Sequence, residues 1–267
     1  KEKAELYHGL KSGSIKLVAG THALLEPRLE FANLGLVVVD EEHRFGVMQR
    51  QALLEKGSGD LLVMTATPIP RTLALGLYGD LSMSEIRELP KNRRPIDTRW
   101  ISPEDRGKVY KFIRGQVDLG HKAYIVYPLV ENNEDMPLAA AISEVARIQQ
   151  LKVFKDIKIG LLHGQMNSKE KTSVIQAFSR GQIQILVATT VIEVGIDVPN
   201  ATVIVIDHSQ QFGLAELHQL RGRVGRGPAQ SFCLLIGEPT SELARERLQY
   251  MRTTQDGFQL AEADMRL

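Results

Sequence analysis

Residues 34–47, LGLVVVDEEHRFGV, constrain the fold of this chain more than any other stretch. The apolar run over 36–39 is rich in β-branched residues, which is typical of a strand covered on both faces in a parallel sheet. Asp40, Glu41 and Glu42 follow this run directly. Ligands of open α/β sheets bind at the carboxyl ends of the strands, where two carboxylates can hold a divalent cation and orient a water molecule. The pattern predicts a site at this strand end, with a solvated acidic turn as the alternative.

The composition is that of a globular protein with one large or, as we expect, two medium domains, because 43% of the 267 residues are hydrophobic and 24% are charged. The formal net charge of +1 gives no global signature of a nucleic-acid or membrane-surface protein, so any basic patch must be local. No apolar run approaches the roughly 20 residues that span a bilayer, and the N-terminus lacks the apolar core of a signal peptide. We therefore expect a soluble, cytoplasmic protein.

The single cysteine, Cys233, lies in the apolar run FCLLI. One cysteine excludes a disulfide within the chain, and no Cys/His spacing resembles a zinc site. We expect Cys233 to pack as a small buried hydrophobe.

The alternation of strand and helix patterns occurs twice, so the sequence predicts two βαβ domains joined near PKNRRP at 90–95. The capping box NSKE at 167–170 starts a predicted helix that Gly181 follows. The first half is predicted to contain helices over 1–13, 46–56 and 71–78 and strands over 14–20, 36–39, 61–65 and 83–89. The second is predicted to contain strands over 96–101, 122–127, 157–162, 182–188, 202–206 and 231–236, and helices over 104–119, 139–153, 167–179, 213–220 and 241–252.

Two further strand ends carry candidate site residues. TATPIPRT at 65–72 would bring Thr65 and Thr67 beside the acidic cluster if the two strands are neighbours, although such a segment is also typical of a simple turn. In VATTVIEVGIDVPN at 187–200, Gly195 permits close approach of a ligand to the backbone and Asp197 supplies an acceptor. A glycine turn with a capping aspartate is the alternative there.

The stretch HQLRGRVGRG at 218–227 places Arg221, Arg223 and Arg226 between glycines. Guanidinium groups suit phosphate oxygens because they are planar, always charged and able to bind in a fork. A solvated basic loop would need neither the glycines nor the adjacent Gln219, so the pattern favours a phosphate site. His43, His163 and His218 stand at strand ends or beside these motifs, and we expect only hydrogen bonding from them.

These segments together resemble the motifs of superfamily 2 helicases. DEEH at 40–43, TATPIPRT at 65–72, ATTVIEVGIDVPNA at 188–201 and QLRGRVGR at 219–226 are similar to motifs II, III, V and VI, in the same order. GTHAL at 20–24 resembles motif Ib, and LLHGQM at 161–166 resembles the segment after motif IV. The longer strings resemble two bacterial families, the RecG-type helicases and the transcription–repair coupling factors. ELPKNRRPIDT at 88–98 and DGFQLAEADMRL at 256–267 are more similar to the RecG type.

The resemblance implies an α/β fold of two RecA-like lobes with mainly parallel sheets flanked by helices, the first lobe incomplete. Residues 1–92 would form the C-terminal part of the first lobe, 93–245 the second lobe, and 246–267 the start of a segment that links ATP hydrolysis to movement on duplex DNA. No G-x-x-x-x-G-K-[ST] phosphate loop occurs in the sequence. We therefore interpret the chain as a fragment that lacks this loop and the N-terminal wedge domain of the family.

The resemblance also implies roles for individual residues. Asp40 would hold the Mg²⁺ of Mg-ATP, Glu41 would orient the attacking water, and Arg223 and Arg226 would reach the transferring phosphoryl group. The remaining residues would line the nucleotide cleft (Gln219, Gly195, Asp197), contact the DNA backbone (Gly20, Thr21, His22, His163, Thr189) or couple the two sites (His43, Thr65, Thr67, Arg71).

The function that this resemblance implies is ATP-dependent translocation on duplex DNA to remodel stalled forks and Holliday junctions in bacterial recombination and repair. Its cofactors would be ATP and Mg²⁺, and its partners branched DNA, the missing N-terminal part of the same protein and single-stranded DNA-binding protein. Two alternatives remain at this stage: a transcription–repair coupling translocase that acts on RNA polymerase, and a non-catalytic binding module.

Overall fold

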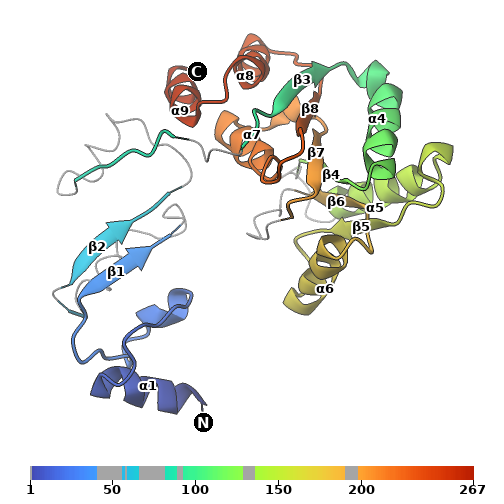
Figure 1. Cartoon of the computed structure of the whole chain (residues 1–267). Helices are drawn as coiled ribbons and strands as arrows, with labels where there is room; N and C mark the ends of the chain where they lie inside the picture. Colours follow the sequence, from blue (N-terminus) through green and yellow to red (C-terminus); the bar gives the residue numbers. More distant parts are fainter. Residues whose placement is uncertain are drawn as a thin grey trace. The chain divides into compact units, whose positions relative to one another are not determined.

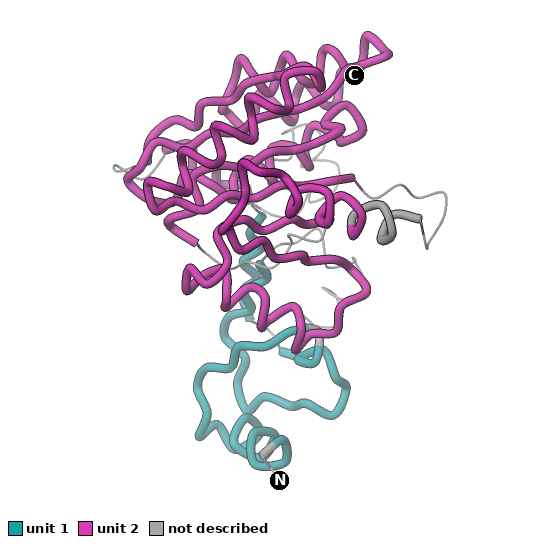
Figure 2. Tube along the Cα trace, turned by 90° about the vertical axis from the view of Figure 1, so that its right-hand side faces the viewer, with its two compact units in different colours: residues 1–68 teal, residues 69–267 magenta. Residues whose placement is uncertain are grey.

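The computed structural model describes residues 2–40, 56–57, 59–65, 82–88, 93–128, 136–189 and 198–267. The chain divides into two compact units, Lys1–Pro68 and Ile69–Leu267 (Figure 2). Apart from Lys56, the predicted helices over 46–56 and 71–78 lie outside the described residues. Residues 89–92 also lie outside the described residues, so the predicted lobe boundary after residue 92 stays a prediction.

Among its described residues, the first unit contains two parallel strands, β1 (Leu36–Val39) and β2 (Asp60–Val63), which pair in register (Figure 1). It begins with α1 (Glu2–Ser12), which is followed directly by Gly13 with a φ of 75°, in agreement with the predicted end of this helix. A short 3₁₀ helix, η1 (His22–Leu25), lies between α1 and β1. The predicted strand over 14–20 is wrong: the N–H of Ile15 donates back to the Gly9 carbonyl of α1, and no described strand pairs with this segment.

One face of the small sheet is covered by the described residues. Val37 and Val39 are buried at 8% and 3% exposure, whereas Leu36 and Val38 on the opposite face are exposed at 58% and 50%. This alternation follows from the period of two along a strand. Burial on both faces, as predicted for this strand, is therefore not seen within the described part of the unit.

The second unit is built on a six-stranded parallel sheet of strand order β3-β8-β7-β4-β6-β5 (Figure 1). All six strands agree with the predicted ones to within about three residues at each end. They are β3 (Asp97–Ile101), β4 (Lys122–Tyr127), β5 (Ile159–Leu162), β6 (Ile185–Thr189), β7 (Ala201–Ile206) and β8 (Phe232–Ile236).

Helices cover both faces of this sheet, because the strands are apolar on both sides. Ile113, Ile148 and Phe154 of α4 (Arg106–Asp118), α5 (Met136–Gln149) and η4 (Lys152–Phe154) form one core with the sheet. The other core is formed with α6 (Ser168–Ser179), α7 (Leu214–Arg221), α8 (Glu242–Thr253) and α9 (Gly257–Arg266). Two further 3₁₀ turns, η3 (Pro103–Asp105) and η5 (Ser209–Gln211), precede α4 and α7.

Local signals for helix ends in the second unit are confirmed. Asn167 Oδ1 accepts from the Glu170 N–H and Glu170 Oε2 accepts from the Asn167 N–H, each at 3.0 Å, which completes the predicted capping box of α6. Gly181 follows that helix with a φ of 77°. Cys233 is fully buried in β8, and burial raises its pKa to about 12, so it packs as a hydrophobe as predicted.

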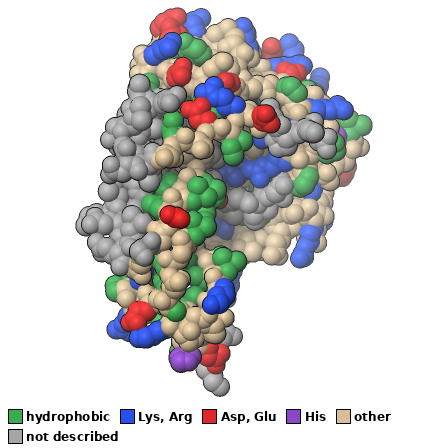
Figure 3. Space-filling model, turned by 60° about the vertical axis from the view of Figure 1, so that its left-hand side comes forward, with side chains coloured by type: hydrophobic (Ala, Val, Ile, Leu, Met, Phe, Trp, Pro, Cys, Tyr) green, Lys and Arg blue, Asp and Glu red, His purple; other side chains and the backbone are tan. Residues whose placement is uncertain are grey.

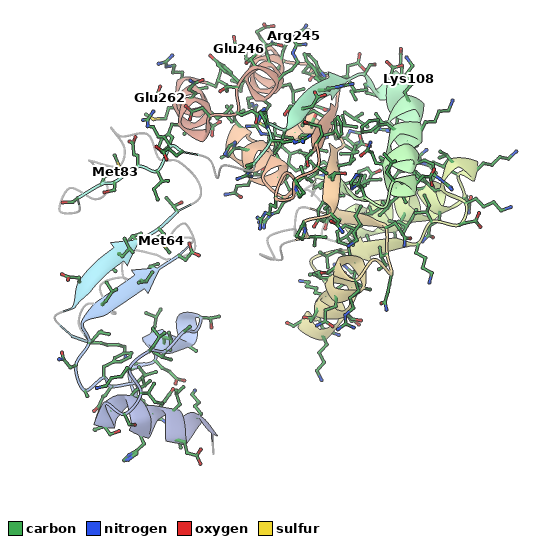
Figure 4. The ribbon with its side chains drawn as sticks, in the orientation of Figure 1. Met64, Met83, Lys108, Arg245, Glu246 and Glu262 are labelled. Carbon is green, nitrogen blue, oxygen red and sulfur yellow. The ribbon has the colours of Figure 1, made fainter. Side chains whose placement is uncertain are left out.

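Two further elements differ from the sequence prediction. Residues 83–88 form no strand, since no described strand pairs with them; Met83 (Figure 4) and Ile86 are exposed at 44% and 88%. Helix α9 was not predicted as a helix. Its N-terminus is capped by Asp256, which accepts from the Phe258 N–H at 2.8 Å.

Candidate functional site

Asp40 and Thr65 follow neighbouring parallel strands at the same edge of the small sheet. Val39 pairs with Val63, and the N–H of Met64 (Figure 4) donates to the Val39 carbonyl at 2.8 Å. The structure thus brings together the two strand ends on which the predicted site depends. The other predicted residues of these motifs, Glu41, His43, Thr67 and Arg71, lie outside the described residues, as do Gly195 and Asp197 of the later glycine-containing motif.

The segment from Gly20 to His22 leads into η1. Thr21 precedes this turn, and its carbonyl accepts from the Leu24 N–H at 3.0 Å. A Cβ on Gly20 would lie 3.1 Å from the Leu24 side chain, so the glycine allows the turn to pack closely. Contact of these residues with DNA stays a prediction.

His163 and Thr189 stand at the carboxyl ends of adjacent strands of the large sheet. Leu162 of β5 pairs with Ala188 of β6. His163 directly follows Leu162, and Thr189 directly follows Ala188. His163 Nδ1 and Thr189 Oγ1 are both buried and have no hydrogen-bond partner among the described residues. A buried polar atom without a partner costs roughly 1–3 kcal/mol, so both atoms call for a partner beyond the described part of the chain.

Helix α7 presents the arginine loop, which we define as residues 222–227. Gly213 is the N-cap of this helix and its N–H donates to Glu216 Oε2 at 3.2 Å, while the apolar side of the helix is buried through Leu214 and Leu217. The Arg223 N–H still donates to the Leu220 carbonyl at 3.0 Å, so the loop leaves the helix as a tight turn. Gln219 is half-buried on this helix.

The glycines of the arginine loop allow close packing within the fold. A Cβ on Gly225, which has a φ of 79°, would lie 2.9 Å from Ile96 Cγ1, and one on Gly227 would lie 2.5 Å from the Pro199 carbonyl oxygen. Any larger residue would push the loop off these neighbours. The glycines therefore hold Arg223, which is half-buried, and Arg226, which is exposed, on a loop with little freedom.

Arg221 has a different role from the other two arginines. Its side chain is 2% exposed, and Nη1 donates to the carbonyls of Met251 and Thr254, both at 2.9 Å. It therefore ties α7 to the C-terminal end of α8. The phosphate site that the sequence predicts is left to Arg223 and Arg226.

His218 lies beside Arg221, with 3.1 Å between His218 Nδ1 and Arg221 Nη2. Burial lowers the pKa of His218 to about 4, and the charges of Arg221 and Arg93 act in the same direction. The imidazole is therefore neutral at pH 7, and Nδ1 accepts the bond because a guanidinium can only donate. Hydrogen bonding is the only role that the sequence predicted for this histidine.

A polar cluster that the sequence did not indicate lies at the carboxyl ends of β4 and β7. Asp207, which follows β7, pairs with Arg106 at 2.7 Å. Tyr127, the last residue of β4, donates to Glu144 Oε1 at 3.0 Å, and Arg147 bonds the same carboxylate. The bond from Arg147 lowers the pKa of Glu144, and burial raises that of Tyr127. The only signal in the sequence was a carboxylate directly after the apolar run VIVI.

Charged side chains elsewhere on the described surface are mixed in sign. Lys and Arg are interspersed with Asp and Glu on the face drawn in Figure 3, in agreement with the net charge of +1. Lys108 on α4 and Arg245 and Glu246 on α8 extend outward from their helices (Figure 4). Among the described residues there is no group of three or more His, Cys, Asp or Glu that could hold a metal ion. The described helices include none that could cross a membrane.

Comparison with known families identifies the class of protein. Residues 1–75 match the DEAD/DEAH box helicase family, and residues 107–228 match the helicase conserved C-terminal domain. A structure of yeast Dbp5 bound to RNA and ADP BeF3 superposes with a TM-score of 0.60 over 92% of this chain and 66% of its own, which at 15% identity supports the fold alone. The chain therefore contains part of a DEAD-type helicase lobe followed by a helicase C-terminal lobe, a class that uses ATP.

Within this class the chain is of RecG type over its whole length. It is 51% identical to the ATP-dependent DNA helicase RecG of Synechocystis over 267 residues and 45% identical to that of Bacillus subtilis over 268, which cover 32% and 39% of those proteins. A structure of RecG bound to a three-way DNA junction matches 99% of this chain and 34% of its own, with a TM-score of 0.80 at 44% identity. The chain spans about a third of the length of the relatives it matches.

Proposed function

We propose that the protein carrying this chain is an ATP-driven translocase on duplex DNA that remodels branched DNA, including stalled forks and Holliday junctions. The observation that carries the proposal is the match to the junction-bound RecG structure over 99% of the chain. This match favours branched DNA over RNA polymerase as the substrate. Because the matched relatives are bacterial, we place the protein in the bacterial cytoplasm, with single-stranded DNA-binding protein as a further partner.

The first part of the proposed mechanism is nucleotide binding at the end of β1. The Asp40 carboxylate suits Mg²⁺, which takes oxygen ligands, and its place at a strand end beside Thr65 is where α/β sheets bind ligands. Bound there with ATP, Mg²⁺ would neutralise charge on the phosphates. Glu41, the next residue, would orient and deprotonate the attacking water, and Thr65, Thr67, His43 and Arg71 would connect this site to the DNA site.

The second part is stabilisation of the transferring phosphoryl group by the arginine loop. Arg223 and Arg226 carry charge that suits phosphate oxygens, and the close contacts of Gly225 and Gly227 restrict where the loop can place them. Gln219 on α7 would line the same cleft together with Gly195 and Asp197.

The third part is contact with the DNA backbone. His163 and Thr189 stand on adjacent strand ends of the second lobe, and in this proposal this end of the sheet faces the phosphate oxygens of DNA. Gly20, Thr21 and His22 would contact the DNA from the first lobe. Such contacts hold DNA of any sequence, as a translocase requires.

The experiment that tests the proposal compares DNA substrates on the full-length protein. ATP hydrolysis and strand separation are measured with a labelled three-way junction, a linear duplex of the same sequence and no DNA. We expect hydrolysis to be stimulated by DNA and the junction to be separated faster than the duplex. Binding of the junction without ATP turnover would instead support a non-catalytic module. A parallel assay measures release of RNA polymerase stalled on a duplex template. Release without junction separation would support a transcription-coupling translocase.

A further inference from the structure

The turn between α8 and α9, residues 254–256, contacts a segment that is distant in sequence. The Ile96 N–H donates to Gln255 Oε1 at 3.1 Å, and Gln255 Nε2 donates to the Ile96 carbonyl at 3.0 Å. One side-chain amide thus binds both main-chain groups of one residue, as a neighbouring strand would. Ile96 immediately precedes β3, where the chain enters the large sheet.

Ile96 also contacts the arginine loop. Its side chain is 7% exposed and lies against Gly225, where a Cβ would approach Ile96 Cγ1 to 2.9 Å. The next residue, Asp97, donates its N–H to the Ser231 carbonyl beyond the loop at 2.9 Å. The entry to the sheet is therefore packed on one side against the loop that carries Arg223 and Arg226.

The same turn is held on its other side by α7. Arg221 Nη1 donates to the carbonyls of Met251 and Thr254, and these two hydrogen bonds join α7 to the end of α8 and the turn. Asp256 then caps α9, and the Arg87 guanidinium lies 4.6 Å from the centre of the Phe258 ring on that helix. The turn consequently connects α7, the sheet entry and the first residues of α9.

We propose that Gln255 is a positioning residue that joins the α8–α9 turn to the sheet entry, so that the arginine loop and α9 move as one body. This inference rests on the proposed function, in which ATP hydrolysis moves the arginine loop. The contact of Gln255 with Ile96, which we call the joint, would pass that motion to α9 and so to the segment that links hydrolysis to movement on DNA. Arg221 cannot supply this link alone, since it bonds α8 and the turn but not Ile96.

The test uses three variants of the full-length protein. Gln255→Leu removes both bonds to Ile96 at similar side-chain size, and Gln255→Glu keeps the acceptor for the Ile96 N–H but loses the donor. Gln249→Leu, at an exposed glutamine of α8, is the matched control. Two quantities are measured: amide hydrogen exchange of residues 257–266 without ATP or DNA, and base pairs separated per ATP hydrolysed on a three-way junction.

Gln255→Leu should speed exchange in α9 about tenfold, because two hydrogen bonds of ordinary strength are lost. The base pairs separated per ATP should fall by a similar factor while the KM for ATP stays within about twofold, and Gln255→Glu should lie between wild type and Gln255→Leu.

Unchanged amide exchange of α9 in Gln255→Leu would overturn the joint, regardless of the number of base pairs separated per ATP. Faster exchange with an unchanged ratio would overturn its role in coupling. A wild-type protein without DNA-stimulated hydrolysis would refute the proposed function and this coupling role together, while faster exchange would still establish the joint as a structural one.

Discussion

Arg106 and Asp207 form an ion pair of 2.7 Å between the start of α4 and the end of β7, and the Asp207 side chain is only 2% exposed. Asp207 Oδ1 also accepts from the His208 N–H at 2.8 Å, and His208 has a φ of 49°, in the left-handed region. The pair therefore helps to hold the chain where it leaves the sheet towards α7. Because the pair lies at this position, we expect it to contribute to the unfolding free energy of the second lobe.

Removal of Arg106 should destabilise the second lobe. Arg106→Ala leaves a buried carboxylate without its partner, which costs about 3 kcal/mol of unfolding free energy. Lys108→Ala is the control, since Lys108 pairs with Asp105 at the surface and is 82% exposed, and it should cost less than about 1 kcal/mol. Denaturant unfolding of both variants gives the comparison. Equal losses would show that burial of Asp207 does not set the strength of the pair.

His218 should make stability depend on pH. Its folded pKa of about 4 lies below the ordinary value of 6.5, so the unfolded state binds the proton more readily. The neutral form stabilises the fold fully above about pH 6.5, and this contribution is lost as the pH falls towards 4. His218→Gln should flatten the difference in stability between pH 7 and pH 4.5, whereas His121→Gln, the control, should leave it intact. Parallel pH profiles for wild type and His218→Gln would contradict the proposed neutral state.

Glu41 should act in hydrolysis and not in binding. Glu41→Gln in the full-length protein keeps the size of the side chain but removes the base that would activate water, so ATP and junction DNA should bind while turnover is lost. Nucleotide binding and steady-state hydrolysis are measured on the same preparation. Wild-type turnover would remove Glu41 from the mechanism.

Arg226 should act on the transition state. Arginine fingers contribute roughly 10³–10⁵ in rate, so Arg226→Ala in the full-length protein should depress kcat far more than ATP affinity. Thermal unfolding should be unchanged, because Arg226 is exposed, whereas Arg221→Ala should lower the unfolding temperature since Arg221 is buried. Weaker ATP binding with an intact kcat would reduce Arg226 to a ground-state contact.

The isolated 267-residue chain should lack DNA-stimulated ATP hydrolysis. The phosphate loop that cradles the triphosphate is absent from the sequence, and Asp40 and the arginines can only flank the nucleotide. The first lobe should also exchange amide hydrogens faster than residues 96–236, because Leu36 and Val38 expose apolar surface in a sheet that has two strands in the described part of the lobe. Robust turnover by the purified chain would refute the first expectation, and slower exchange in residues 1–92 would refute the second.

Local patterns in the sequence were sufficient to predict most of the strands and helices of the second lobe. The β-branched runs of β4, β6 and β7 and the capping box at Asn167 were read correctly because strand and helix ends there depend on neighbouring residues in the chain. The segments over 14–20 and 83–88 look equally strand-like, yet neither forms a strand. A strand needs a partner to accept its hydrogen bonds, and that is not a property of the segment itself.

The sequence by itself determined which residues are candidates for the chemistry, since the acidic strand end at Asp40 and the arginines of the loop are defined by residue type and spacing. Only the tertiary structure decided which of these side chains are buried in the fold. Arg221 looks identical to Arg223 and Arg226 in the sequence, but it is buried against Met251 and Thr254, and Gln255 meets Ile96 from 159 positions away. Such contacts depend on how helices pack on the sheet, which no local pattern encodes.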